Sequence, residues 1–313
     1  MREVVIPLAT GITLFLFGMR LMRIGLDELS GKYLKGFLHR FTKTPYHGFF
    51  TGTIATMLLQ SSSAVTVITI GLINSKMISF YQAIGIVLGT NLGTVVTVEL
   101  IALNINQWAV PLLIIGALLV LIPYGKCRPI GLFIGGFSII FLGIDALQMI
   151  AIPLQNTAFF SYIVTVPKQQ IVIGIIFGTI VTAVIQSSSA VTAMTMSMML
   201  YQNVPLTFGL AIILGSNIGT CFTAILASIG GTTEGKQVAT AHVLLNVLGV
   251  IFIFPFIDSF SVFVQTLSSY PPTQIAHAQL VFNLASSLVA LLFVKPFTNL
   301  TLLLAPKGNT VDR

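Results

Sequence analysis

The stretch that decides the fold is GTIATMLLQSSSAVT, residues 52–66, which recurs as GTIVTAVIQSSSAVT at residues 178–192. The two copies are identical at eleven of fifteen positions and lie 126 residues apart. The same offset relates GTNLGT, residues 89–94, to GSNIGT, residues 215–220. Two motifs in one register predict a duplicated structural module.

Composition places the chain in a membrane. Charged residues make up 7% of it, apolar residues 55%, and the mean hydropathy is +0.99. So few charges cannot cover a water-facing surface, which excludes ordinary soluble classes. The net charge of +7 would suggest nucleic acid in a soluble protein, but most basic residues here flank apolar segments, as the positive-inside rule describes. Cys127 and Cys221 lack metal-ligand spacing and are interpreted as packing residues.

Seven apolar segments have spanning length, at residues 4–26, 80–103, 108–124, 129–150, 206–229, 238–257 and 275–298. Two further apolar segments, about 48–77 and 171–201, carry a Gln-Ser-Ser-Ser tetrad at the centre. Polar groups in mid-span are costly, whereas two half-helices meeting at a tip buried in protein find partners for them. Both segments are therefore predicted to be re-entrant hairpins.

Smaller features follow from the pattern between these segments. The glycines of the 89–94 and 215–220 runs predict broken helices at mid-depth. The basic stretch 32–43 has apolar residues at helical spacing, which predicts an amphipathic helix on the membrane surface. A second surface segment is predicted to precede Gln170.

The predicted fold is an all-α integral membrane protein made of two inverted repeats. Residues 1–125 form the first repeat and residues 126–258 the second, each with three spans and one hairpin. Three crossings are an odd number, so the second repeat must be inverted relative to the first. Residues 259–313 supply a C-terminal span and a short cytoplasmic tail.

Charge bias predicts an N-terminus outside the cell membrane and a C-terminus in the cytoplasm. This orientation leaves only Arg2 and Lys168 outside. It places all the other lysines and arginines at the cytoplasmic side: Arg20, Arg23, Lys32, Lys35, Arg40, Lys43, Lys76, Lys126, Arg128, Lys236, Lys295, Lys307 and Arg313.

The tetrads carry the chemistry expected of an anion and cation site. Hydroxyls and the free N–H groups of the second half-helix suit an oxyanion with phosphate-like oxygens, which the dipole also favours. The candidate anion-binding residues are Gln60, Ser61, Ser62, Ser63, Gln186, Ser187, Ser188 and Ser189. The alternative is that the serines only cap a helix or pack between helices.

Oxygen ligands for a hard monovalent cation come from the same region. The candidates are Gln60, Ser63, Thr66, Asn91, Thr94, Gln186, Ser189, Thr192, Asn217 and Thr220. Hydrogen bonding between helices is the alternative for the asparagines and their neighbouring threonines.

Few ionisable residues lie within the apolar segments. Glu99 is a candidate for coupling through a cation or a proton, or it reaches the outer interface. Asp145 aligns with Arg20 when the first helices of the two halves are superposed at an offset of 125, and both are coupling candidates. His242 and His277 are interpreted as packing or interfacial residues, because no metal-ligand spacing surrounds them.

An enzyme is not expected. The serine tetrads have no His or Lys near them in sequence to act as a base, and the chain contains no nucleotide-binding fingerprint, so we expect no cofactor.

The twin Gln-Ser-Ser-Ser tetrads, the two Gly-rich runs and the Ala276-His277 and Phe282-Asn283 pairs resemble the type II sodium/phosphate cotransporter family over residues 10–297. This resemblance implies sodium-coupled uptake of inorganic phosphate, with the two tips converging near mid-membrane. It implies phosphate and sodium at the tetrads, with Asn91 and Asn217 beside them. Many bacterial relatives carry a cytoplasmic regulatory domain, and a chain that stops at Arg313 resembles a minimal prokaryotic form.

Rival hypotheses stay open at this point. They are a proton-coupled transporter with Glu99 or Asp145 as carrier, an exporter, a carrier of another oxyanion, a membrane phosphate sensor without transport, and an intramembrane serine hydrolase. The sequence is also compatible with a homo-oligomer and with a regulatory protein acting in trans.

Overall fold

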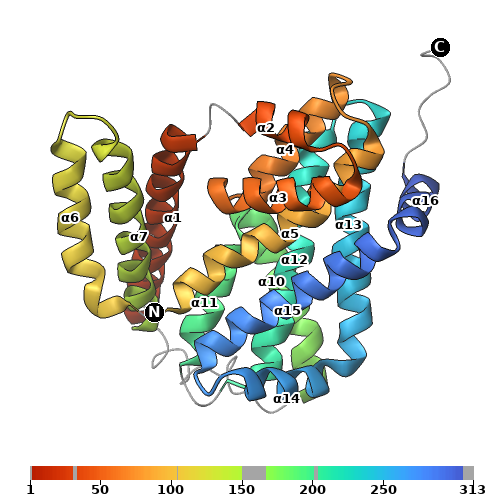
Figure 1. The fold of residues 1–313 in the computed structure, drawn as a ribbon. Helices are drawn as coiled ribbons and strands as arrows, with labels where there is room; N and C mark the ends of the chain where they lie inside the picture. Colours follow the sequence, from red (N-terminus) through yellow and green to blue (C-terminus); the bar gives the residue numbers. More distant parts are fainter. Residues whose placement is uncertain (1, 31–33, 104, 150–166, 201–203, 306–313) are drawn as a thin grey trace.

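The computed structural model describes residues 2–30, 34–103, 105–149, 167–200 and 204–305 (Figure 1). This part of the chain is helical and contains no strand. The first half comprises α1 (Arg2–Ser30), α2 (Leu34–Phe41), α3 (Pro45–Leu59), α4 (Ser62–Asn74), α5 (Phe80–Ala102), η2 (Asn106–Trp108) and α6 (Ala109–Leu121). The rest comprises α7 (Cys127–Gln148), α10 (Pro167–Ile185), α11 (Ser188–Met199), α12 (Leu206–Ser228), α13 (Thr233–Ile253), η3 (Phe254–Phe256), α14 (Ile257–Leu267), α15 (Pro271–Leu292) and α16 (Val294–Leu304).

Six stretches among the described residues are long and apolar enough to cross a membrane, which makes the chain a multi-pass membrane protein. They are Val5–Leu29, Phe80–Ala102, Cys127–Gln148, Leu206–Ser228, Thr233–Leu267 and Pro271–Leu292. The seventh predicted span, 108–124, is shorter than expected, since its apolar helix covers Asn106–Leu121. The surface segment predicted before Gln170 lies largely outside the described residues.

The predicted amphipathic helix forms as α2, and part of its apolar side packs against protein. Leu34 and Leu38 are buried in a cluster with Leu59 and Val65 of the neighbouring helices. Phe41, at the end of α2, is 50% exposed and follows the basic residue Arg40.

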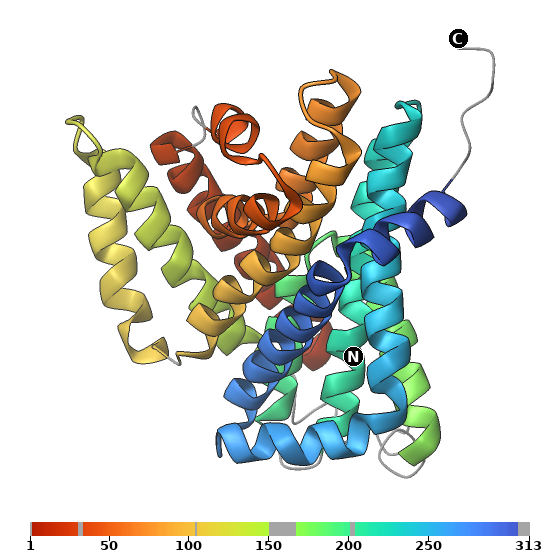
Figure 2. The ribbon, with the colours of Figure 1, turned by 45° about the vertical axis from the view of Figure 1, so that its right-hand side comes forward.

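The segment with the first tetrad folds as two helices that meet at a break. Helix α3 runs parallel to α5, because Pro45 touches Gly85 and Phe49 touches Gly89. Helix α5 thus starts beside the beginning of α3, so α4 must return along the length that α3 has covered. With about 1.5 Å of rise per residue, the 15 residues of α3 and the 13 of α4 have similar lengths. Figures 1 and 2 show α4 rising from this break toward the start of α5.

The second tetrad segment repeats this packing. Helix α10 runs parallel to α12, with Ile175 beside Gly215 and Thr179 beside Gly219. These contacts lie 126 residues from their counterparts in the first half. The hydroxyl contacts match too: Thr53 Oγ1 lies 2.8 Å and 3.2 Å from the carbonyl oxygens of Phe49 and Gly89, and Thr179 Oγ1 lies 2.8 Å and 3.0 Å from those of Ile175 and Gly215.

The predicted breaks at the two Gly-rich runs are wrong. Helices α5 and α12 continue without interruption through both. The glycines serve close packing instead: a Cβ atom at Gly89 would lie 2.1 Å from the Phe49 carbonyl oxygen, and one at Gly215 would lie 2.0 Å from that of Ile175. Glycine therefore lets the α3–α5 and α10–α12 backbones touch.

The first helices of the two halves, α1 and α7, pack antiparallel. Gly18 lies against Gly136, and Gly143 lies against Gly11. These contacts are reciprocal, because an offset of 125 converts Gly18 into Gly143 and Gly11 into Gly136. Helix α6 packs on the other side of α7 through Gly116 and Gly135, completing a layer beside the tetrad helices (Figure 1).

Several connections with basic residues lie at one end of the molecule, the top in Figure 1. A 2.7 Å bond between the Thr232 hydroxyl and Asn74 Oδ1 joins the start of α13 to the end of α4, near Lys236 and Lys76. The Arg128–Glu28 ion pair, 2.7 Å, joins the start of α7 to the end of α1. The side chains of Arg2 and Lys168, and residues Lys32, Lys307 and Arg313, lie outside the described part.

Candidate functional site

Both tetrads adopt the same uncommon backbone. Gln60 and Gln186 have φ of 52° and 57°, in the left-handed region, and they end α3 and α10. Ser61 and Ser187 follow in extended conformation and begin the next helices as N-caps. Residues other than glycine adopt positive φ infrequently. The repeated sequence therefore forms the same helix–break–helix turn twice.

One serine of each tetrad caps the following helix. The Ala64 N–H donates to Ser61 Oγ at 3.2 Å, and the Ala190 N–H to Ser187 Oγ at 3.3 Å. The capping alternative thus applies to Ser61 and Ser187. It leaves two serines per tetrad in the first turn of a helix, where unpaired N–H groups and the positive dipole end favour an anion.

Three hydrogen bonds hold Gln60 at the first tip. The Gln60 side chain is 7% exposed; its Oε1 accepts a bond from Thr97, and its Nε2 donates to the Met57 carbonyl at 2.6 Å. The Gln60 backbone carbonyl accepts a bond from Arg23 Nε of α1 at 3.0 Å. The first tip is therefore fixed to α5 and to α1.

Contacts also cross between the halves at this tip. Ser63 Oγ lies 3.5 Å from the Thr223 hydroxyl of α12, and α11 in turn contacts α5. Thr223 lies 126 residues after Thr97, so the two threonines occupy equivalent positions in α12 and α5. Sequence reasoning missed both, although their shared offset was the signal that could have identified them.

Arg23 was also missed as a site residue. It was counted only as a positive-inside charge, yet it reaches the tetrad from a partly buried position. No carboxylate within the described residues forms an ion pair with it, since the only pairs there are Arg128–Glu28 and His277–Glu99. A partly buried guanidinium bonded to a neutral carbonyl leaves its charge uncompensated, which favours a nearby anion.

The second tip has different surroundings. Gln186 is exposed, whereas Ser188 and Ser189 are 6% and 4% exposed. One turn later, the Thr192 hydroxyl lies 2.9 Å from the Ser188 carbonyl and 2.7 Å from Gln279 Oε1 of α15. Here the last long helix, rather than α1, supplies the side chain beside the tetrad.

The asparagines and threonines of the Gly-rich runs make helix contacts. Asn91 Nδ2 donates to Asn246 Oδ1 of α13 at 3.0 Å, and Asn217 Nδ2 to the Ile213 carbonyl at 2.8 Å. Thr94 and Thr220 donate to carbonyls four residues earlier in their own helices. Only the Asn91 bond joins two helices, as the alternative of hydrogen bonding between helices predicts; the other three bonds lie within one helix. Thr66 is buried, and its hydroxyl has no partner within the described residues.

The coupling candidates are dispersed. Arg20 is exposed, and Asp145 accepts a bond from Asn106. Antiparallel packing of α1 on α7 separates Arg20 from Asp145, because Gly18 lies opposite Gly136 while Gly11 lies opposite Gly143. The alignment of Asp145 with Arg20 therefore reflects equivalence between repeats and not contact.

The remaining ionisable candidates lie on α5, α13 and α15. Glu99 Oε1 lies 3.1 Å from His277 Nδ1, which joins α5 to α15. His242 is 1% exposed, and neither ring nitrogen has a partner within the described residues. No group of three His, Cys, Asp or Glu residues that could hold a metal ion occurs in that part of the chain.

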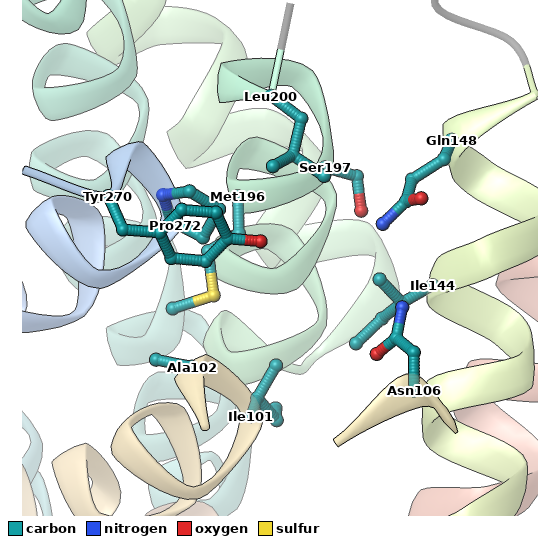
Figure 3. A pocket seen from close by; sticks show the side chains of 10 residues that line it. All are labelled: Ile101, Ala102, Asn106, Ile144, Gln148, Met196, Ser197, Leu200, Tyr270 and Pro272. Carbon is teal, nitrogen blue, oxygen red and sulfur yellow. The ribbon is translucent and has the colours of Figure 1, made fainter. Parts of the chain in front are cut away.

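A small cavity of about 20 Å³ lies at the end opposite the basic connections, between α7, α11 and α15 (Figure 3). Its polar lining comes from Asn106, Gln148, Ser197 and Tyr270, and Gln148 and Ser197 point toward each other. Burial raises the pKa of the Tyr270 hydroxyl above its usual value. The volume has room for about one water molecule.

The Na+/Pi-cotransporter family model matches residues 14–149 and 156–269, which make up most of the chain. The uncharacterized protein YqeW of Bacillus subtilis (strain 168) is 36% identical over 295 residues, 94% of this chain and 96% of that protein. No solved structure matches the chain.

Two further relatives carry names that mention phosphate. YjbB of Escherichia coli (strain K12), named for inorganic phosphate export, is 24% identical over 294 residues, 92% of this chain and 53% of that protein. The chain thus spans about half the length of YjbB. Sodium-dependent phosphate transport protein 2A of Ovis aries is 33% identical over 79 residues, 24% of this chain and 12% of that protein. The twin tetrads and the family match agree, and the chain belongs to the Na+/Pi-cotransporter family, a family of phosphate transporters and not of enzymes.

Proposed function

We propose that this protein is a sodium-coupled secondary transporter that imports inorganic phosphate by alternating access. The observation that carries the proposal is the contact between Arg23 and the Gln60 carbonyl. It puts an uncompensated positive charge at a hydroxyl-rich helix break, where an oxyanion gains both charge and hydrogen bonds. Ser62, Ser63, Ser188 and Ser189 are the hydroxyls that we assign to phosphate, with the help of the helix N-termini.

The inverted arrangement is part of the proposal. Equivalent helices α1 and α7 pack antiparallel, and α5 begins at the end of the molecule where α12 finishes. Three crossings per half, with α6 as the short third helix of the first, are consistent with this inversion. The parallel pairing of α3 with α5 and of α10 with α12 supports re-entrant hairpins, each returning to the side from which it entered.

Two observations support sodium as the coupling ion: side-chain oxygens lie near the tips, and the names of the family and of one relative mention sodium. Amide and hydroxyl oxygens are suitable ligands for a hard monovalent cation. A bound cation also offsets the charge of an anion that is costly to dehydrate, so each ion should strengthen binding of the other. The basic end of the molecule supports a cytoplasmic location for that end and an external N-terminus.

The test is counterflow of labelled phosphate in proteoliposomes containing only this protein. Uptake should require sodium and should stop when choline replaces it. Uptake that follows a pH gradient, with sodium irrelevant, would contradict sodium coupling and favour Glu99 or Asp145 as a proton carrier. Phosphate binding without flux would favour a sensor.

Export is a second candidate, because the YjbB relative is named for it. The direction of a secondary transporter follows the gradients, so both directions are accessible to one mechanism. Vesicles of defined orientation separate the two: an outward phosphate flux that resists reversal of the sodium gradient would favour export.

A further inference from the structure

Helix α15 carries two buried amide side chains, Gln279 and Asn283, on one face. Both are 1% exposed, although they lie within the membrane-spanning stretch Pro271–Leu292. Asn283 Oδ1 and Gln279 Nε2 have no hydrogen-bond partner within the described residues. Leaving a buried polar atom unpaired costs about 1–3 kcal/mol, so two such atoms one turn apart call for a ligand.

The orientation of the Gln279 amide decides which of its atoms is free. The Thr192 hydroxyl carries one proton, but it lies within bonding distance of both the Ser188 carbonyl and Gln279 Oε1. One proton cannot serve both acceptors. Turning the amide lets its Nε2 donate to Thr192 Oγ while Thr192 donates to the Ser188 carbonyl, and then Oε1 becomes the free atom. In that arrangement α15 presents two free carbonyl oxygens.

Helix α15 runs antiparallel to α11, which places these oxygens beside the second tip. Ile275 lies with Met199 around Gly209, and Gln279 bonds to Thr192. One turn further along α15 is Asn283, and one turn back along α11 is Ser188. Asn283 is therefore level with the second tetrad.

Helix α15 also runs antiparallel to α5. His277 pairs with Glu99 at one end, and Ala290 shares a buried cluster with Leu88 at the other. Between these two points Asn283 is level with the GTNLGT run of α5. The helix that belongs to neither repeat thus brings its free amide oxygen to the region between both.

We propose that Gln279 and Asn283 of α15, together with the Thr192 hydroxyl oxygen of α11, form a sodium site beside the second tip. Neutral amide and hydroxyl oxygens without a carboxylate suit a monovalent hard cation better than a divalent one. The distance of one helical turn between the two amides lets both reach one ion. This inference rests on the proposed function and assigns its coupling ion to a helix outside the repeats.

The experiment has two readouts on purified protein: equilibrium binding of radioactive sodium without phosphate, and the sodium dependence of phosphate counterflow. Asn283→Ala and the volume-matched Gln279→Met should each raise the half-maximal sodium concentration about tenfold or more, since lost ligand-shell interactions typically weaken metal binding by that factor. The apparent phosphate affinity at saturating sodium should change less than about twofold, because this site does not contact the anion. Asn283→Asp, which keeps an oxygen at the site, should bind sodium at least as well as Asn283→Ala.

The matched control is Ser286→Ala, whose hydroxyl lies on α15 near Gly249 of α13 and bonds to the Asn283 backbone carbonyl. It should leave sodium binding unchanged. If radioactive sodium binds equally well to wild type, Asn283→Ala and Gln279→Met, the inference is wrong. If wild type binds sodium at these residues but transports phosphate without it, the proposed coupling fails while the site stands. Should Asn283→Ala fold poorly by gel filtration, Gln279→Met carries the test.

Discussion

The two tetrad tips share one backbone but have different neighbours. At each break, a glutamine in the left-handed backbone conformation is followed by a serine that caps the next helix. Gln60, however, is buried and bound by Thr97, while Gln186 is exposed. Duplication fixes the turn, and the flanking helices set its surroundings.

Part of the difference between the two tips follows from the sequence. At the offset of 125 that relates α1 to α7, Arg23 corresponds to Gln148, a neutral residue in the cavity of Figure 3. The helix equivalent to α1 therefore carries no charge at the position that α1 uses to hold the first tip. The first tip should therefore contribute more to anion binding than the second, whose neighbouring side chain comes from α15.

The largest expected effect comes from removing that charge. Arg23→Gln should raise the phosphate KM in counterflow about 10- to 100-fold, because hydrogen bonds to charged groups contribute about 1.5–3 kcal/mol. Arg23→Lys should retain part of the affinity. The exposed Arg128, already paired with Glu28, provides the control, and Arg128→Gln should change the KM little. Equal effects at both arginines would remove Arg23 from the site.

The second-largest expected effect tests the close helix packing that both halves share. Gly89→Ala and Gly215→Ala should each lower stability by about 1–3 kcal/mol, since a methyl group there would overlap a carbonyl oxygen of α3 or α10. Thermal unfolding in detergent measures it. Gly71→Ala is the control, because no atom of another helix lies within 4 Å of the position that its methyl group would take. A large loss at only one of the two tight glycines would contradict equivalent packing.

A smaller effect should separate the two glutamines. Gln60→Ala removes a buried side chain with two hydrogen bonds and should lower kcat/KM about tenfold. Gln186→Ala removes an exposed side chain and should lower it about two- to threefold. Both variants place alanine at the same φ, so backbone strain cancels in the comparison. Matching losses would mean that Gln186 becomes buried during transport.

The smallest effect concerns the equivalent threonines. Thr97→Val should lower kcat/KM about fivefold because it leaves Gln60 Oε1 without a partner. Thr223→Val breaks a long 3.5 Å contact with Ser63 and should change kcat/KM less than about twofold. A double variant should show additive losses, because the two threonines contact different residues.

Much of the architecture could be predicted from the repeat. The polar tetrads located both breaks, since four polar residues inside an apolar segment leave few alternatives. The prediction of broken helices at the Gly-rich runs was wrong, because glycine permits either an interrupted helix or close contact between two intact helices. Only the position of α3 beside α5 distinguishes these cases.

The site was harder to predict because its residues come from helices outside the motifs. Arg23 near the end of an apolar segment has the pattern of an interface charge, and sequence does not show that it reaches the tip. The exposure of Gln186 could not be predicted either, since the two tetrads have identical sequences.

The packed interface between α1 and α7 restricts how the molecule can move. Gly11, Gly18 and Gly25 are spaced by seven residues, as are Pro129, Gly136 and Gly143 across from them. This heptad spacing is that of a left-handed supercoil, and here the backbones themselves touch. Sliding one helix along the other would drive larger side chains into those contacts. The pair should therefore move as one rigid unit, and the Arg23 bond should carry the first tip with it.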